Sequence, residues 1–154
     1  MFHKILFSIC LTVFSFSSIA QNDSPHHIGV SAGVTTGAGL SYRYWPSKLG
    51  FQITALPSIV NNNGSVTSLG ASILYTLNDS KVIDLYSYLG NSIIYMKSDY
   101  YSEMIYNSGI GFGLKFEIFD ELNINTQLGY GGIDISGKNS TFSIIGEIGL
   151  YYNL

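Results

Sequence analysis

Apolar residues alternate with small or polar residues along the chain from residue 28 to its last residue. In residues 140–154, STFSIIGEIGLYYNL, the register that begins at Phe142 is apolar apart from one glycine, and the register that begins at Ser143 is small, mixed and partly polar. A period of two places successive side chains on opposite faces of a strand, and a helical period is hard to find. The pattern predicts eight strands, over residues 28–35, 38–44, 50–57, 66–77, 82–96, 106–116, 122–130 and 140–154.

The connections between the predicted strands alternate in kind. Tight turns are expected at 46–49, 78–81 and 117–121, and longer polar loops at 58–65, 97–103 and 131–140; only the connection near Thr36 and Gly37 is short on the loop side. Short turns at one end, longer loops at the other and an even number of strands are typical of a membrane barrel. We therefore expect an all-β fold, a closed antiparallel eight-stranded transmembrane barrel in up-and-down meander order. Both faces of 82–96 are mixed, so its facing stays open and a bulge or register change is expected there.

The composition of the two registers indicates which face points outward. A soluble barrel would carry many lysines and glutamates on its polar face, but here that register is rich in glycine, serine and amides, and only 11% of the chain is charged. Small residues suit the crowded interior of an eight-stranded barrel. The apolar register is therefore predicted to face lipid. The alternative is a soluble periplasmic barrel of the lipocalin type, with the apolar register lining a ligand cavity.

Aromatic residues gather at the ends of the predicted strands, as expected for two belts at the two interfaces of a bilayer. The predicted aromatic girdle consists of Tyr44, Trp45, Tyr75, Tyr95, Tyr106, Tyr130 and Tyr152.

The first twenty residues have the pattern of a cleaved secretory signal: a basic start at Lys4, a short apolar run, and small residues before Gln21. We expect residues 1–20 to be the signal peptide and residues 21–154 to form one barrel domain. Cleavage would remove Cys10, the one cysteine, and would leave six of the seven basic residues against ten acidic ones, a formal charge of −4. This balance does not indicate a nucleic-acid partner, which requires a basic patch.

Three stretches carry a family resemblance: GLSYRYWPSKLGFQ (39–52), NSGIGFGLKF (107–116) and the last strand. They resemble the small outer-membrane β-barrel family of Gram-negative bacteria, which includes the eight-stranded OmpA, OmpX and OmpW-type barrels and the porin-family outer membrane protein β-barrel domain. The resemblance implies a location in the bacterial outer membrane, lipid and the barrel-insertion machinery as partners, and no shared catalytic residues. Such chains usually end on an aromatic residue, whereas this one ends on Leu154, with Tyr152 two residues before it.

The candidate chemistry of the chain is sparse. The glycines between Gly109 and Gly113 lie inside a predicted strand and do not have the spacing of a nucleotide-binding loop. Adjacent histidines such as His26 and His27 point to opposite faces of a strand and would chelate a metal poorly. No base is placed beside a nucleophile, so we expect no enzyme, no metal and no cofactor.

Charged residues in the small register are the most informative polar positions. Arg43, Lys115 and Glu147 occupy it and are predicted to form a lumen charge cluster, in which Glu147 pairs with Arg43 or Lys115 because an isolated charge in a narrow lumen is unfavourable. We expect this pairing to stabilise the barrel; a gate in a small conductance pathway is the alternative.

The function expected from the sequence is a structural or surface-interaction role, with the lumen filled by side chains and no catalysis. The first alternative is a narrow porin that passes ions or small solutes, and the second is the soluble ligand-binding barrel. A monomer is expected, with a possible surface ligand bound through loops 58–65, 97–103 and 131–140.

Overall fold

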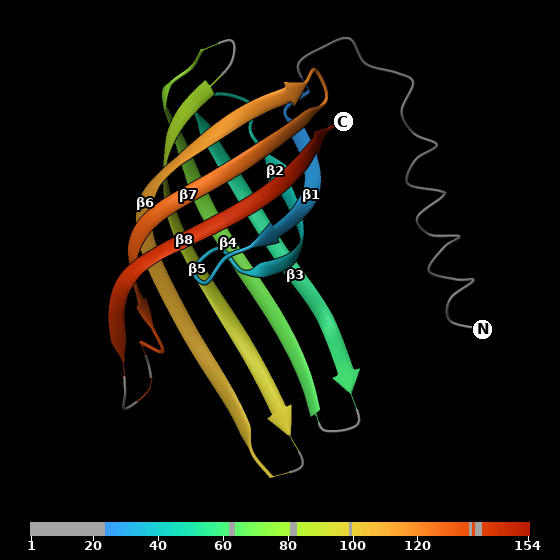
Figure 1. Ribbon diagram of the computed structural model, residues 1–154, viewed down its shortest axis with the longest axis vertical. Coiled ribbons are helices and arrows are strands. Elements are labelled where there is room, and N and C mark those ends of the chain that lie inside the picture. Colours follow the sequence, from blue (N-terminus) through green and yellow to red (C-terminus); the bar gives the residue numbers. More distant parts are fainter. Residues whose placement is uncertain (1–23, 62–63, 81–82, 99, 136, 138–139) are drawn as a thin grey trace, which may run out of the picture.

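The computed structural model describes residues 24–61, 64–80, 83–98, 100–135, 137 and 140–154, so the predicted signal peptide lies outside the described residues. The described chain forms a closed antiparallel barrel of eight strands in meander order, in which β1 pairs with both β2 and β8, and this confirms the predicted fold (Figure 1). The strands are β1 (His26–Ala32), β2 (Ala38–Tyr44), β3 (Leu49–Asn61), β4 (Gly64–Asn78), β5 (Ile83–Ser98), β6 (Ser102–Phe119), β7 (Leu122–Ile133) and β8 (Thr141–Asn153). Within the described residues, no helix has the length and hydropathy needed to cross a bilayer.

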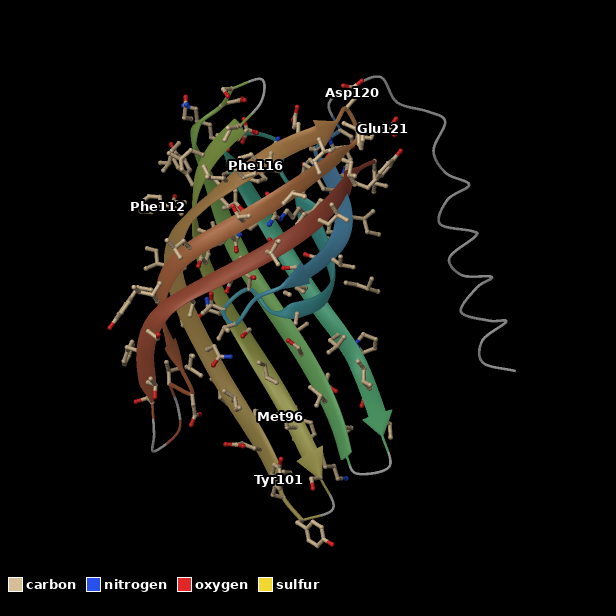
Figure 2. All side chains as sticks on the ribbon, viewed as in Figure 1. Met96, Tyr101, Phe112, Phe116, Asp120 and Glu121 are labelled. Carbon is tan, nitrogen blue, oxygen red and sulfur yellow. The ribbon has the colours of Figure 1, made fainter. Side chains whose placement is uncertain are left out.

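The two ends of the barrel differ. We call the end that holds the β2–β3, β4–β5 and β6–β7 connections the turn end; His26 and Leu154, linked by a backbone hydrogen bond of 2.9 Å, also lie there. The opposite end is the loop end. Figure 2 shows Asp120 and Glu121 at the turn end and Tyr101 at the tip of the loop end.

The strands are very unequal in length, which the sequence pattern did not indicate. β1 and β2 have 7 residues each, whereas β5 has 16 and β6 has 18. The predicted loops 58–65 and 97–103 were wrong in extent, because β3 continues to Asn61, β4 begins at Gly64, and β5 and β6 pair as far as Lys97 and Ser102. Backbone ladder bonds do not require apolar side chains, so the polar residues there extend the strands rather than ending them.

The apolar register faces outward along the wall. Leu40, Ile110 and Ile144 are 64%, 62% and 73% exposed, and Figure 2 shows Phe112 projecting from the outer side. The inward register holds buried polar residues such as Gln52 and Asn125. The predicted facing is therefore correct, and the alternative of a barrel with the apolar register inside is wrong.

Tyrosine rings and glycines complement each other inside the barrel. β5 turns Tyr86 and Tyr88 inward, which settles the facing that its sequence left open. A Cβ on Gly113 would overlap the Tyr86 ring, and a Cβ on Gly111 would lie 2.8 Å from the Tyr88 ring. The expected irregularity near this strand lies on its neighbour, where the β4–β5 register shifts between Thr76 and Asn78.

Candidate functional site

The connection between β1 and β2 folds into the lumen instead of projecting from the barrel. Thr35 and Thr36 are fully buried, and the Gly33 N–H donates to the Gly37 carbonyl at 3.1 Å, which closes the loop. Gly37 has a φ of 85°, a left-handed backbone that favours glycine. Figure 1 shows this connection at mid-height of the barrel, while β3 to β6 continue to the lower end. We call residues 33–37 the plug.

A row of glycines on the opposite wall makes room for the plug. Gly90, Gly109 and Gly131 are cross-strand neighbours on β5, β6 and β7. A Cβ on Gly90 would come within 2.9 Å of the Thr35 carbonyl oxygen, and one on Gly109 would come within 2.9 Å of Thr35 Cγ2. The glycines predicted as general lumen packing thus have a specific use, because the tip of the plug crosses the lumen and lies against them.

The plug is also held by side chains of that wall. The Val34 carbonyl accepts hydrogen bonds from Ser92 Oγ at 2.5 Å and from Asn107 Nδ2 at 3.2 Å. These bonds pair a loop carbonyl that would otherwise be buried without a partner.

Glu147 fixes the plug from the β8 side. Its Oε1 accepts hydrogen bonds from the Thr35 N–H (2.7 Å), the Thr35 hydroxyl (2.7 Å) and the Thr36 N–H (3.2 Å), and its Oε2 accepts one from the Thr36 hydroxyl (2.6 Å). Two successive backbone N–H groups directed at one oxygen form an anion-binding nest. Glu147 lies inside and is only 6% exposed. Its expected ion pair with Arg43 or Lys115 was wrong, because no basic side chain of the described residues lies within ion-pair distance of it.

Arg43 belongs to a separate polar network on the turn-end side of the plug. Its Nε donates to Gln52 Oε1 at 2.7 Å, and its Nη1 donates to Asn125 Oδ1 at 2.6 Å. The guanidinium lies 3.8 Å from the centroid of the Tyr151 ring and 5.9 Å from that of Tyr86. Arg43 is 2% exposed, so its charge is balanced by amide dipoles and aromatic faces rather than by a carboxylate of the described residues.

Lys115 lies at the turn end and pairs with acids there. Its Nζ is 2.6 Å from Asp84 and 3.4 Å from Glu117. These three residues line an open recess of about 930 Å³ at the mouth of the barrel, together with His27. The three predicted lumen charges therefore occupy three separate places instead of one cluster.

Trp45 does not belong to the outer girdle. It packs against Gly50 and lies edge-on to Tyr86 at a centroid distance of 5.1 Å, so it closes the lumen at the turn end. The prediction was wrong because Trp45 follows the last residue of β2, and strand alternation no longer sets its direction there. The other predicted girdle residues occupy outward positions: Tyr44, Tyr75, Tyr95, Tyr106, Tyr130 and Tyr152.

The adjacent histidines point to opposite sides of β1, as expected. His26 Nδ1 lies 2.6 Å from the Tyr42 hydroxyl on the outer side, and His27 Nδ1 lies 2.6 Å from Asn153 Oδ1 on the inner side. Among the described residues, no group of three or more histidine, cysteine or acidic side chains could hold a metal ion.

The lumen is thus closed at two levels, by the plug at mid-height and by the Arg43 network with Trp45, Tyr86 and Tyr151 toward the turn end. Sequence reasoning missed Thr35 and Thr36, which resemble an ordinary hairpin turn. One signal was present in the sequence. Glu147 is the one acid among the apolar and small residues of the last strand, and a closed barrel places that strand beside the first strand, whose short connection carries two hydroxyls.

No family model and no curated protein matches the sequence. Among solved structures, Neisserial surface protein A matches with a TM-score of 0.52 at 14% identity, over 85% of this chain and 98% of that one. The N-terminal β-barrel domain of Pseudomonas aeruginosa OprF matches with a TM-score of 0.52 at 16% identity, over 84% of this chain and 95% of that one. The chain has the fold of the small eight-stranded outer-membrane barrels. At these identities the likeness to this barrel fold concerns architecture alone.

Proposed function

We propose that this protein is an integral outer-membrane barrel with a closed lumen, which acts through its structure and its loop-end surface rather than by catalysis or transport. The observation that carries the proposal is the reversed distribution of polarity: apolar side chains are exposed on the wall, and polar side chains are buried inside. In water such a wall would be an exposed apolar surface far larger than monomeric soluble proteins carry. In a bilayer the same wall needs no cover, and a closed barrel pairs its backbone groups internally.

The two closures of the lumen favour a structural or surface role over a narrow porin. Tyr86, Tyr88 and Tyr151 are at most 2% exposed, and the plug fills the lumen beyond them. A surface role is supported by the loop end, where Tyr100 is 96% exposed and Tyr101 is 58% exposed. Large exposed aromatic side chains are common anchors of binding surfaces.

Two measurements on membranes from expressing cells test this proposal. The protein should stay in the membrane fraction after washing at high pH, and the unboiled protein should migrate differently from the boiled protein on a cold SDS gel, because a closed barrel resists the detergent. Release into the soluble periplasmic fraction, together with an unshifted band, would contradict the membrane location.

A further inference from the structure

The wall of the barrel is incomplete in its loop-end half because β1 and β2 are short. A strand of 7 residues rises about 18 Å at the usual tilt, which is less than the apolar band of about 25 Å on a membrane barrel. The β1–β8 pairing ends at Ala32 with Ile148, and the β2–β3 pairing ends at Leu40 with Ala55. Beyond these points, residues 56–61 of β3 and 141–147 of β8 have a strand neighbour on one side only. We call the space between these two free edges the seam.

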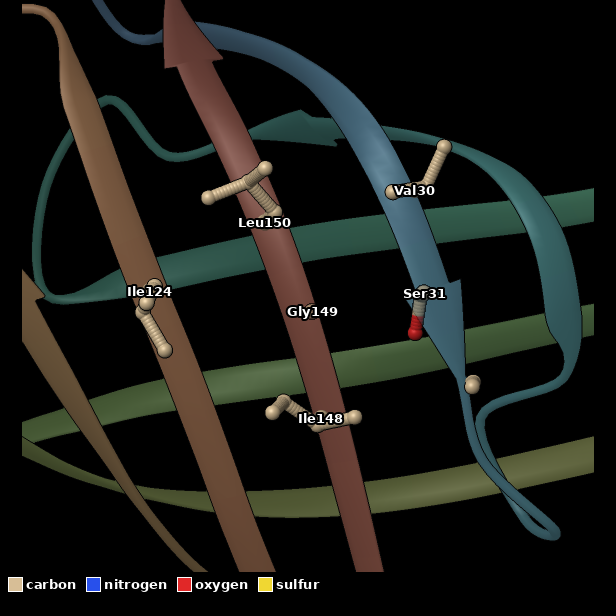
Figure 3. A pocket seen from close by; sticks show the side chains of 7 residues that line it. Val30, Ser31, Ile124, Ile148, Gly149 and Leu150 are labelled. Atoms are coloured by element: carbon tan, nitrogen blue, oxygen red, sulfur yellow. The ribbon is translucent and has the colours of Figure 1, made fainter.

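Apolar outer side chains border the seam, which begins beside the apolar wall and reaches the level of Tyr130 at Ile144. Ile144 and Phe142 on the free edge of β8 are 73% and 61% exposed and face outward, and the Phe142 ring stacks on Tyr130 at 6.3 Å. An apolar groove of about 320 Å³ on the outer wall ends where the seam begins, since Ile148 and Leu150 line it and Glu147 is the next residue of the free edge. Figure 3 shows Ile148, Leu150 and Val30 around this groove at the β1–β8 joint.

The inner face behind the seam differs from the rest of the lumen. Toward the turn end the inward side chains are mostly polar, with the buried rings of Tyr86, Tyr88 and Tyr151 among them, but beyond the plug most are large and apolar and retain some exposure. These inward residues are Leu56, Ile59, Val66, Ile94, Met96, Ile105 and Ile133. Ile59 is 59% exposed and Val66 is 39% exposed. Ile145 and Thr35 form the floor, because both contact the glycines at 109 and 131.

The free edge of β3 is unsuited to pairing with another strand. Pro57 lacks a backbone N–H, and the register of β3 shifts between Leu56 and Ile59. Proline and bulges are devices that prevent strand addition at exposed edges. A second copy or an extended peptide that added a strand to β3 would meet this obstacle, whereas a flexible hydrocarbon chain would not.

We propose that the acyl chain of a membrane lipid enters through the seam and lies against the apolar inner face above the plug. This inference rests on the proposed membrane location. The plug then has a second use: it is the floor that separates an apolar loop-end half from the polar network around Arg43. The occupant is a lipid rather than a solute from water, because the seam opens toward the bilayer along the apolar groove.

Single-cysteine labelling can test this directly, because Cys10 is the one cysteine and lies in the predicted signal peptide. Nitroxide labels would be placed on Ile94→Cys and Ile105→Cys, which face inward above the plug, with the barrel folded into phosphatidylcholine–phosphatidylglycerol vesicles. Matched controls are the outward neighbour Ile93→Cys, in lipid, and the exposed Tyr100→Cys, in water. Both inward labels should resemble Ile93, with a several-fold higher ratio of oxygen to nickel-chelate accessibility than the label at Tyr100.

A second arm uses a phospholipid with a photoreactive diazirine in its acyl chain. Adducts are expected on Ile94 and Met96 as well as on the outer wall, and Ile105→Gln should reduce the inner adducts several-fold. Met104→Gln, its outward neighbour, should leave them unchanged, and both variants should retain the heat-dependent gel shift.

The alternative outcomes are distinguishable. A heat-shifting barrel whose inward labels are accessible to the nickel chelate would overturn the inference, because water would fill the space. Labels protected from both reagents, with cross-linked dimers on the gel, would overturn it in favour of a second copy. Loss of the gel shift and of membrane association would instead refute the proposed function on which the inference depends.

Discussion

Glu147 is a buried carboxylate whose hydrogen-bond partners within the described part of the chain all belong to the plug, so its removal tests whether the plug depends on it. Glu147→Ala would leave the N–H groups of Thr35 and Thr36 buried without an acceptor. At about 1–3 kcal/mol for each orphaned group, the free energy of unfolding should fall by about 2–6 kcal/mol. Glu147→Gln retains an oxygen for both groups and should lose less. Urea unfolding in vesicles measures this, with the exposed Glu103→Gln as a control; an alanine variant as stable as wild type would contradict the anchoring role.

Arg43 is the complementary case, a buried cation with no carboxylate partner among the residues that the structure describes. Its planar fork donates to Gln52 and Asn125 while its face lies on Tyr151. A lysine provides one point charge and cannot reproduce both bonds and the stacking, so Arg43→Lys should lower the free energy of unfolding by roughly 2–4 kcal/mol. Trp45, the one tryptophan, packs on Tyr86 and should report the change by its fluorescence. Lys115→Arg, at a partly exposed ion pair, should change stability by less than about 1 kcal/mol; equal effects of the two variants would contradict a special environment at Arg43.

At the scale of elements, the position of the plug against β4 can be tested by adding one methyl group to a glycine of that strand. A Cβ on Gly70 of β4 would overlap the Thr36 carbonyl oxygen and come within 2.8 Å of Gly37 Cα, whereas a Cβ on Gly146 of β8 meets nothing within 4 Å. Gly70→Ala should therefore displace the plug and lower the temperature at which the unboiled band converts to the boiled form by several degrees. Gly146→Ala should leave that temperature unchanged. A parallel response of both variants would mean that the plug does not occupy this position.

The same elements show how far the sequence could be interpreted. Strands β6, β7 and β8 have clean alternation, and their existence, facing and meander order could be predicted because one register of each strand is largely apolar. The position of the plug could not, because Gly90, Gly109 and Gly131 are brought opposite one another, with Gly70 diagonal to Gly90, only through the registers between strands. A one-residue shift in any register would separate them, and no local pattern fixes those registers.

The lengths of the strands and the facing of β5 could not be predicted from the sequence for related reasons. Polar residues near 58–65 and 97–103 look like loops, yet a ladder that continues beyond the apolar band is free to carry polar side chains. β5 has mixed faces because its inward tyrosines, Tyr86 and Tyr88, are accommodated by glycines on β6 and β7. The signal that would have resolved this facing lies on other strands, not on β5 itself.

For the whole molecule, the closure of the lumen at two levels predicts that the barrel does not conduct ions. Wild-type protein in planar bilayers should show no discrete channels, because the plug and the turn-end residues Trp45, Tyr86 and Tyr151 each obstruct the lumen. Gly70→Ala should also be silent: even with the plug displaced, the Arg43 network and its aromatic neighbours remain. Channels in wild type would restore the narrow porin as the function. Channels in Gly70→Ala alone would show that the plug is the one effective barrier and acts as a gate, because ions would then pass the turn-end residues once the plug is displaced.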